Sequence, residues 1–326
     1  MNNLNKIINW VIDVPAHDWD NNIAVLGGHP LQSTLWGRVR QLDGIKDFRW
    51  AALYEGKIIF MVRFEVRYMP LIGQFAWIPK GPVFTADLMV IKAYNELLSR
   101  LSSFGYTFCI QDPYLSAPDF IKGSRIFSRP RTILIDLKLG EEKLFAALDS
   151  QWRYGVRLAE RTGITVEHSR KQVDIDEFFY LCRKSSRKKG FYFPFSKASI
   201  QELIVCSQHP QVEAKLFIAR YQAHMAAAAI VLRCGNSLHY FFGATNRNFS
   251  KHRPSEALQW KIIEWAIKNG LKVYDLEGVD AVKNPGVYHF KRKMGGVELE
   301  LPGKYAYPFC LRGRLAISAG RLLRRV

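Results

Sequence analysis

One order of secondary-structure signals occurs twice along this chain. Residues 50–54 and 57–66 read as two strands that turn at Gly56, which is typical of a β-hairpin. An amphipathic helical stripe follows and ends at Gly105, and a short apolar strand comes next. The same order recurs in the second half, where the corresponding helix ends at Gly270, 165 positions later. The repeat predicts two similar domains of mixed α and β structure in tandem.

The composition agrees with two packed cores. The chain has 326 residues, of which 48% are hydrophobic, and this is ample for two domains. Between the two repeats, residues 141–162 read as one helix that ends at Gly163. Its basic edge holds three arginines at a spacing of four: Arg153, Arg157 and Arg161. This edge suits either a solvent-exposed helix face or a row of phosphate contacts.

The chain is strongly basic. Its 47 Lys and Arg residues exceed its 29 Asp and Glu residues, which gives a net charge of +18. Such an excess indicates a polyanionic partner, which could be a nucleic acid, an anionic membrane surface or a phosphorylated substrate.

The cysteines and apolar runs exclude other classes of protein. Five scattered cysteines without a CxxC spacing argue against both a disulfide framework and a zinc site. The N-terminus lacks the apolar core of a signal peptide, and the longest purely apolar run, Met225–Leu232, is too short to span a bilayer. We therefore expect a cytoplasmic protein.

The segment from Gly270 to Gly296 carries the clearest candidate chemistry. A buried strand that ends in acidic residues passes into a Gly/Pro loop, and Phe290 and Lys291 follow before a Gly-Gly pair. A lysine fixed beside an aromatic residue in such a loop can stabilise a developing negative charge. The alternative is a basic β-turn on a basic surface.

Eight segments together resemble one known family. In chain order they are Leu31–Arg38 (LQSTLWGR), Pro79–Phe84 (PKGPVF), Cys109–Pro113 (CIQDP), Arg153–Ala159 (RYGVRLA), Ser185–Phe191 (SSRKKGF), the helix Leu258–Asn269, the turn Asp275–Gly278 (DLEG) and the pair Phe290-Lys291. These motifs, in this order and over nearly the whole chain, resemble the FemABX aminoacyltransferases.

The resemblance implies a fold. It predicts an α/β (mixed α+β) protein of two tandem acetyltransferase-like (GNAT) domains, without the long coiled-coil arm of many family members. The first domain would span residues 1–140 and be completed by residues 297–326, and the second would span residues 141–296.

The resemblance also implies an activity in cell-wall synthesis. Members of the family move an amino acid from aminoacyl-tRNA to the stem-peptide amine of a peptidoglycan precursor, which is nucleotide- or lipid-linked. Aminolysis of this ester needs no metal and no covalent enzyme intermediate, so aminoacyl-tRNA would be a co-substrate and no cofactor is expected. The sequence leaves open which amino acid is transferred, how many are added and in which form the acceptor is bound.

Two residues are the candidate catalytic groups. Lys291 matches the family lysine and would stabilise the oxyanion, while Asp112 is the candidate general base. The alternative role of Asp112 is a turn or capping acid before Pro113. Asp275 and Glu277, at the corresponding strand end of the second half, are expected to be structural and to orient Lys291.

Six further residues are candidates for substrate binding: Trp36, Arg38, Ser185, Arg187, Tyr240 and Phe290. Arg38 stands where the family has a lysine and keeps its charge, and Ser185 replaces a threonine and keeps its hydroxyl. Tyr240 could orient the peptide stem or could be a core aromatic residue.

The sequence is also compatible with other functions. A GNAT-fold acyltransferase acting on envelope polysaccharide or lipid would use acyl-CoA, but neither half contains the glycine-rich turn that usually binds its pyrophosphate. A non-catalytic nucleic-acid-binding protein would explain the charge alone. Residues 311–326 contain five arginines and no acid, and they suit peripheral contact with an anionic membrane or a packing helix. We expect a monomer.

Overall fold

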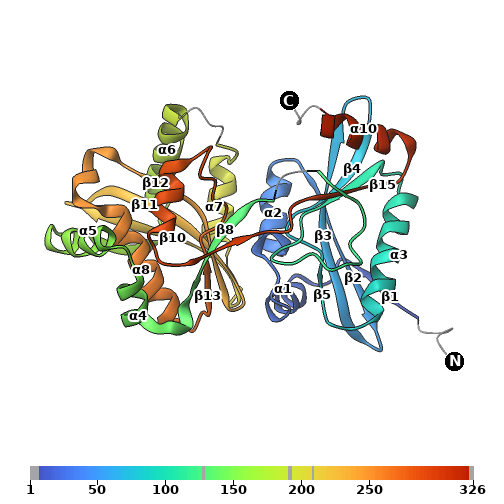
Figure 1. The fold of residues 1–326 in the computed structure, drawn as a ribbon, viewed down its shortest axis with the longest axis horizontal. Coiled ribbons are helices and arrows are strands. Elements are labelled where there is room, and N and C mark those ends of the chain that lie inside the picture. The colour runs from blue at the N-terminus through green and yellow to red at the C-terminus, as the bar shows by residue number, and fades with distance from the viewer. Residues whose placement is uncertain (1–6, 127–128, 190–192, 208, 323–326) are drawn as a thin grey trace. The chain divides into compact units, whose positions relative to one another are not determined.

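The computed structural model describes residues 7–126, 129–189, 193–207 and 209–322 (Figure 1). The chain divides into two compact units, which consist of residues 1–130 with 301–326 and of residues 131–300. The limits differ from the expected 140/141 and 296/297 because β8 (Arg131–Asp136) and β14 (Val297–Glu300) pair with each other in the sheet of the second unit. That each unit is a domain able to fold alone stays a prediction.

The first unit contains an eight-stranded sheet. Its strands run in the order β1-β2-β3-β4-β6-β15-β7, and β5 pairs with β3. They are β1 (Asn9–Ile12), β2 (Lys46–Tyr54), β3 (Lys57–Met69), β4 (Gly73–Ile78), β5 (Val83–Phe84), β6 (Phe108–Gln111), β7 (Ser124–Arg125) and β15 (Tyr305–Pro308). The helices are α1 (Ala16–Val25), η1 (Pro30–Gln32), α2 (Thr34–Leu42), α3 (Met89–Ser103) and α10 (Leu311–Leu322).

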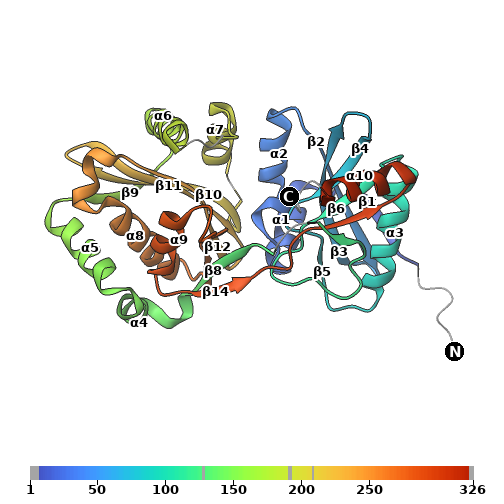
Figure 2. The same cartoon turned by 45° about the horizontal axis from the view of Figure 1, so that its top comes forward.

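Alternating side chains of β3 face two different layers. Phe60, Val62 and Phe64 join the apolar core beneath α3, while Arg63 and Glu65 point to the opposite face, where Arg63 pairs with Asp47 of β2. Figure 2 shows α3 on one side of this sheet and α1 and α2 on the other.

The second unit contains a seven-stranded sheet in the order β14-β8-β13-β12-β11-β10-β9. Its further strands are β9 (Thr165–Ser169), β10 (Val212–Tyr221), β11 (His224–Cys234), β12 (Ser237–Thr245) and β13 (Val273–Asp275). Its helices are η2 (Leu137–Leu139), α4 (Gly140–Ala147), α5 (Ser150–Arg161), α6 (Gln172–Lys189), α7 (Lys197–Val205), η3 (Arg247–His252), α8 (Pro254–Lys268) and α9 (Pro285–Arg292). In Figure 2, α6 and α7 lie on one side of this sheet, and α4, α5 and α8 lie on the other.

The two units share the predicted plan. In each, an antiparallel hairpin (β2–β3 or β10–β11) is followed by a third strand (β4 or β12), a helix (α3 or α8) and a short strand (β6 or β13), and in the first unit the two-residue β5 lies between β4 and α3. The short strand after the helix pairs in parallel with the third strand, β6 with β4 and β13 with β12. All other pairs are antiparallel, so both parallel pairs occur at the same step of the chain.

The helix expected over residues 141–162 is wrong in one respect. It is two helices, α4 and α5, which are separated at Leu148 and Asp149. Leu148 has an extended backbone, and the side chain of Asp149 accepts a hydrogen bond from the backbone N–H of Gln151 and thereby caps α5. The predicted apolar stripe is nevertheless buried, because Leu144, Leu148 and Trp152 all enter the core.

Candidate functional site

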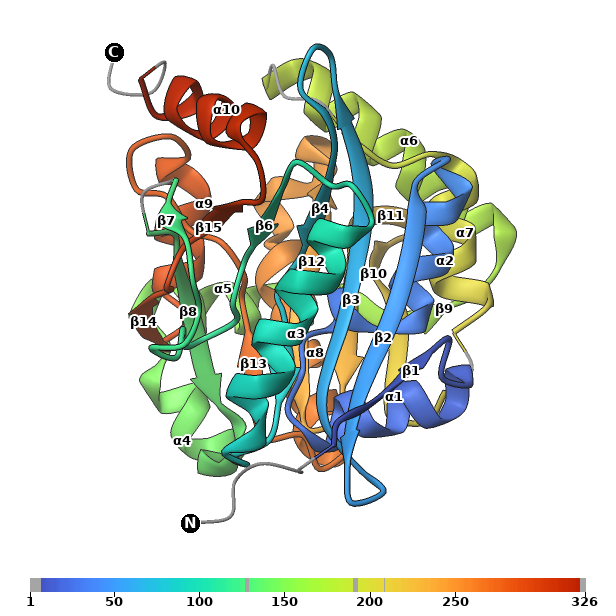
Figure 3. The same ribbon diagram turned by 90° about the vertical axis from the view of Figure 1, so that its right-hand side faces the viewer.

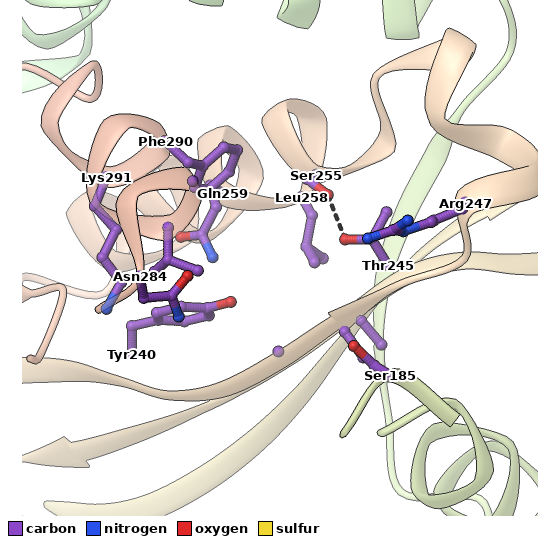
Figure 4. A pocket seen from close by; sticks show the side chains of 15 residues that line it. Ser185, Tyr240, Thr245, Arg247, Ser255, Leu258, Gln259, Asn284, Phe290 and Lys291 are labelled. Carbon is purple, nitrogen blue, oxygen red and sulfur yellow. Dashed lines mark hydrogen bonds between the residues drawn. The ribbon is translucent and has the colours of Figure 1, made fainter. Parts of the chain in front are cut away.

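A pocket of about 390 Å³ opens in the second unit between β12 and the helices α6, α8 and α9 (Figure 4). Its polar lining consists of Ser185, Tyr240, Thr245, Arg247, Ser255, Gln259, Asn284 and Lys291. Among the described residues, the lining contains no carboxylate, imidazole or thiol, so they offer no ligand set for a metal ion in this pocket. Its charged groups are cations, which favour an anionic or electron-rich ligand.

Lys291 lies on a helix and not in the expected loop. The segment after Asn284 forms α9, and Pro285 at its first position supplies the fixed φ that helix starts favour. The helix places Phe290 and Lys291 on successive positions. The indole N–H of Trp152 donates to the backbone oxygen of Phe290 at 3.2 Å, which ties α9 to α5.

The ammonium of Lys291 is held by backbone oxygens. The side chain is buried, with 6% of its surface exposed, and Nζ donates to the carbonyl oxygens of Glu277 at 3.2 Å and Gly278 at 3.0 Å. It also lies 5.3 Å from the centre of the Tyr240 ring, within cation–π range. An ammonium has three N–H donors, so one remains for a ligand in the pocket.

Burial changes the acidity of this lysine. Loss of hydration lowers the pKa of Lys291 to about 8, while the negative charges of Glu277 and Asp275 oppose the shift. The side chain is therefore still mainly cationic at neutral pH. Because it is poorly hydrated, an added negative charge in the pocket would interact with it strongly.

The turn that presents the two carbonyls is itself tightly held. Glu277 adopts a left-handed backbone conformation with φ of 58°, which is unusual for a residue other than glycine. Its N–H donates to Oδ1 of Asp275 at 2.7 Å, and its carboxylate lies 2.8 Å from Nδ1 of the buried His239. Asp275 thus holds the turn whose carbonyl oxygens accept from Lys291, and the charges of Asp275 and Glu277 act on the pKa of Lys291 as well.

Tyr240 forms the floor below Lys291. The strand β12 bulges between Tyr240 and Phe242, which lie opposite the consecutive residues Val231 and Ile230. The hydroxyl oxygen of Tyr240 lies over Gly243, where an added Cβ would come within 2.1 Å of it. Desolvation, with a smaller contribution from Cys182, raises the pKa of the phenol, which therefore stays neutral.

The structure brings four of the eight candidate residues together. Ser185, Tyr240, Phe290 and Lys291 line this one pocket, and the Phe290 ring lies 5.0 Å from that of Trp152. Arg187 is on α6 as well but is exposed and does not line the pocket.

The other three candidates belong to the first unit. Trp36 and Arg38 lie on α2, where Trp36 is buried and the Arg40 guanidinium lies 5.8 Å from its ring centre. Asp112 follows β6, is buried, and has its carboxylate 3.9 Å from Nζ of Lys80. Their roles toward a substrate stay predictions.

A second hollow continues from the pocket. Both cavities share Ser185, Thr245 and Arg247, and the second adds Lys184 and Lys188 from successive turns of α6. Its lining contains no acid, and these cations have no ion-pair partner within the described residues. We call these two hollows the basic channel.

No sequence motif pointed to the polar residues at the corner between β12 and α8. Thr245 and Ser255 share a hydrogen bond of 2.7 Å between their hydroxyls, and Arg247 lies beside them, whereas Asn284 lies near Tyr240 and Lys291 (Figure 4). Gln259 accepts from the hydroxyl of Tyr274 at 2.8 Å, which leaves its amide nitrogen to donate. The available signal was the position of this corner between the third strand and the helix of the repeat.

Comparison with known proteins identifies similar sequences. A family model described as "Acetyltransferase (GNAT) domain" matches residues 149–292. The UDP-N-acetylmuramoylpentapeptide-lysine N(6)-alanyltransferase of Weissella viridescens is 21% identical over 267 residues, which are 73% of this chain and 76% of that protein. The lipid II:glycine glycyltransferase of Staphylococcus haemolyticus (strain JCSC1435) is 27% identical over 88 residues, which are 25% of this chain and only 20% of that protein.

Solved structures show the same fold. The crystal structure of FemX superposes with a TM-score of 0.79 at 17% identity and covers 96% of this chain and 100% of its own. A tandem GNAT protein from the clavulanic acid biosynthesis pathway covers 93% of this chain and 99% of its own, with a TM-score of 0.52 at 10% identity. The predicted FemABX resemblance and the tandem GNAT-like fold are therefore confirmed.

Proposed function

We propose that the protein transfers an aminoacyl group from aminoacyl-tRNA to an amine of a peptidoglycan stem peptide. The observation that carries this proposal is the buried Lys291, whose third N–H is left to face an acid-free pocket. Support comes from two similar proteins whose names state transfer of alanine or glycine to such precursors. The amine attacks the ester carbonyl, the bond to the ribose oxygen breaks, and a peptide bond forms.

Lys291 stabilises the tetrahedral oxyanion in this reaction. The two carbonyls and the Tyr240 ring fix its ammonium before the substrate arrives, so no reorganisation is needed when the charge develops. The attacking ammonium must also lose a proton, and we assign Asp112 as the general base. The ester is already activated, so positioning and charge stabilisation suffice and no cofactor is required.

The basic channel favours a polynucleotide donor over acyl-CoA. Lys184, Lys188 and Arg247 present unpaired positive charge along a path that leads toward Lys291, which suits the phosphodiesters near the 3′ end of a tRNA.

The start of α8, where GNAT enzymes hold pyrophosphate, is unsuited to that group. Pro254 has no N–H, and the buried carboxylate of Glu256 lies in the first turn, 3.0 Å from Arg253. A second anion there would be repelled.

Six residues contact the acceptor in this proposal. Trp36, Arg38 and Arg187 bind the precursor, while Ser185, Tyr240 and Phe290 position the reacting peptide in the pocket. The acceptor is nucleotide- or lipid-linked, and α10 makes peripheral contact with an anionic membrane at the cytoplasmic side. No helix within the described residues is long and apolar enough to cross a membrane.

The test is a transfer assay on the purified chain, which we expect to act as a monomer. Labelled amino acids charged on a mixed tRNA pool, or labelled acetyl-CoA in parallel, are offered with the nucleotide-linked precursor. We expect labelled precursor only from the tRNA pool, with RNase treatment of the donor abolishing it. Label transferred from acetyl-CoA alone would keep the fold and overturn this function.

A further inference from the structure

Two elements of the first unit expose large apolar side chains at one end. The tip of the β3–β4 hairpin carries Tyr68, with 71% of its surface exposed, and Leu71, with 96% exposed. Leu71 lies at a left-handed position of the turn, with φ of 67°. On α10, Leu311 is 70% exposed and Leu315 is 61% exposed. Exposed side chains of this size on neighbouring elements mark an interaction surface.

The two elements are neighbours because both contact Thr107. The backbone N–H of Thr107 donates to the carbonyl of Gln74 at the start of β4, at 2.9 Å. Its own carbonyl accepts from the N–H of Phe309 at 3.0 Å and lies so close to Gly313 of α10 that a Cβ there would come within 2.1 Å. Figure 3 shows the hairpin tip and α10 at the same end of this unit.

The segments that contribute the hairpin tip and α10 carry no negative charge, because residues 66–86, 97–111 and 301–322 contain no aspartate or glutamate. Asp43 and Asp47 lie toward the same end of the sheet, since Lys46 pairs with Val66, but their charges are offset by ion pairs with Arg40 and Arg63. Arg312 and Arg314 are exposed on α10 between the apolar positions. Leucines beside arginines on segments without acids fit the headgroup region of an anionic bilayer, where the apolar groups enter the acyl boundary and the guanidinium groups remain at the phosphates.

We propose that the β3–β4 hairpin tip and α10 together form a membrane-docking end for anionic phospholipid. The inference extends the proposed contact of α10 to a second, independent element, and it does not require the transfer reaction. The apolar tip argues against RNA as the occupant, since phosphodiesters would contact only the arginines.

Co-sedimentation of the full chain with vesicles tests this surface. Phosphatidylcholine vesicles are compared with vesicles that also contain phosphatidylglycerol. We expect binding that requires phosphatidylglycerol and weakens with salt. Leu71→Glu and Leu311→Glu should each lower the partition coefficient about tenfold, because each removes one leucine side chain that enters the bilayer on binding. Arg312→Glu combined with Arg314→Glu should lower it by at least about tenfold.

Leu88→Glu is the matched control. Leu88 is 86% exposed in the same unit but precedes α3, whose 15 residues place it roughly 20 Å from the Thr107 end. Its binding should equal that of the unchanged chain. Equal losses in the Leu88 and Leu71 variants, or equal binding to both kinds of vesicle, would overturn the proposal.

A second measurement tests the hairpin tip without introducing a charged residue there. Leu71→Cys, in a background with the exposed Cys206 and Cys310 changed to serine, carries an environment-sensitive dye. We expect a blue shift on adding phosphatidylglycerol vesicles, and none for dye at Leu88→Cys. An unshifted dye at residue 71 would contradict docking through the tip. Transfer to the nucleotide-linked precursor, measured without vesicles, should be unchanged in these variants, which separates this inference from the proposed function.

Discussion

Among the residues that the structure describes, each unit buries one Lys or Arg side chain, and the two cations are held in opposite ways. Arg63 of β3 has no exposed surface, and its guanidinium lies 2.7 Å from Asp47, 3.0 Å from Glu65 and 2.9 Å from the carbonyl oxygen of Leu31. Lys291 of α9 is almost as deeply buried but donates only to two carbonyls. No carboxylate of the described residues lies within ion-pairing distance of its Nζ.

The difference separates a structural charge from a functional one. The charge of Arg63 is satisfied within the protein, so no ligand is needed to stabilise it. Burial is nevertheless unfavourable there, since desolvation raises the pKa of Asp47 to about 6 despite the neighbouring Arg63. Lys291 also loses hydration on burial, but no carboxylate pairs with its ammonium. A negative charge that forms in the pocket would therefore stabilise this ammonium.

Arg63→Met should produce the largest loss of stability. It leaves Asp47 buried without its ion-pair partner and removes one of the cations beside Glu65, and breaking a buried pair in this way costs about 3–5 kcal/mol. Urea unfolding followed by circular dichroism measures the loss.

Arg67→Met is the control, because Arg67 also pairs with Glu65 but is one-third exposed, and its loss should cost under about 1 kcal/mol. Similar losses in both variants would mean that Arg63 is not the structural counterpart of Lys291.

Lys291→Met should lower turnover and leave stability unchanged, in contrast to Arg63→Met. Removing one preorganised donor from a developing oxyanion lowers turnover about 10²- to 10³-fold, whereas stability should be kept because a desolvated ammonium is replaced by an apolar group of similar length. Single-turnover transfer from aminoacyl-tRNA measures the effect, and Arg292→Met, at the exposed next position of α9, should transfer normally. Near-normal transfer by Lys291→Met would refute the assigned role.

Sequence patterns predicted the hairpins, the repeated helix and the burial of the apolar stripes, because local periodicity determines them. They predicted a loop for the short Gly/Pro-rich segment that forms α9. This helix packs through Phe290 against Trp152, a residue distant in sequence. They also did not show that some motif residues are structural. The Gln32 amide bridges the backbone of Arg63 and Pro79, and Gly81 leaves no room for a Cβ beside it. Such contacts join residues distant in sequence, which no local pattern reports.

The pH dependence of transfer should sharpen the contrast. The pKa of Lys291 is about 8 in the folded protein and 10.5 as the ordinary value, so the ammonium that stabilises the oxyanion is lost above pH 8. Deprotonation of the acceptor amine affects the unchanged chain and Lys291→Arg alike, so turnover of the unchanged chain relative to Lys291→Arg should fall about tenfold per pH unit above this value. Lys291→Arg keeps its charge, and its pH–rate profile should lack this fall.

The stability of the folded protein should rise with pH, whereas turnover falls. Between pH 8 and 10.5 the unfolded chain still binds the proton that folded Lys291 has released, so the unchanged protein gains stability relative to Lys291→Met as the pH rises. Urea unfolding of both proteins at pH 7.5 and pH 9.5 measures this. A constant difference between them would show that the pKa of Lys291 is not lowered by folding.

Gly243→Ala should have the smallest effect and tests whether Tyr240 supports Lys291. The added Cβ would lie 2.1 Å from the Tyr240 hydroxyl oxygen, so the ring must move and its cation–π contact with Lys291 weakens. Loss of a contact worth about 1 kcal/mol predicts a fall in turnover of about fivefold. Gly286→Ala is the matched control, because Gly286 lines the same pocket but has open space around a Cβ. If both alanines reduced turnover equally, Tyr240 would be part of the pocket wall and not a support for the cation.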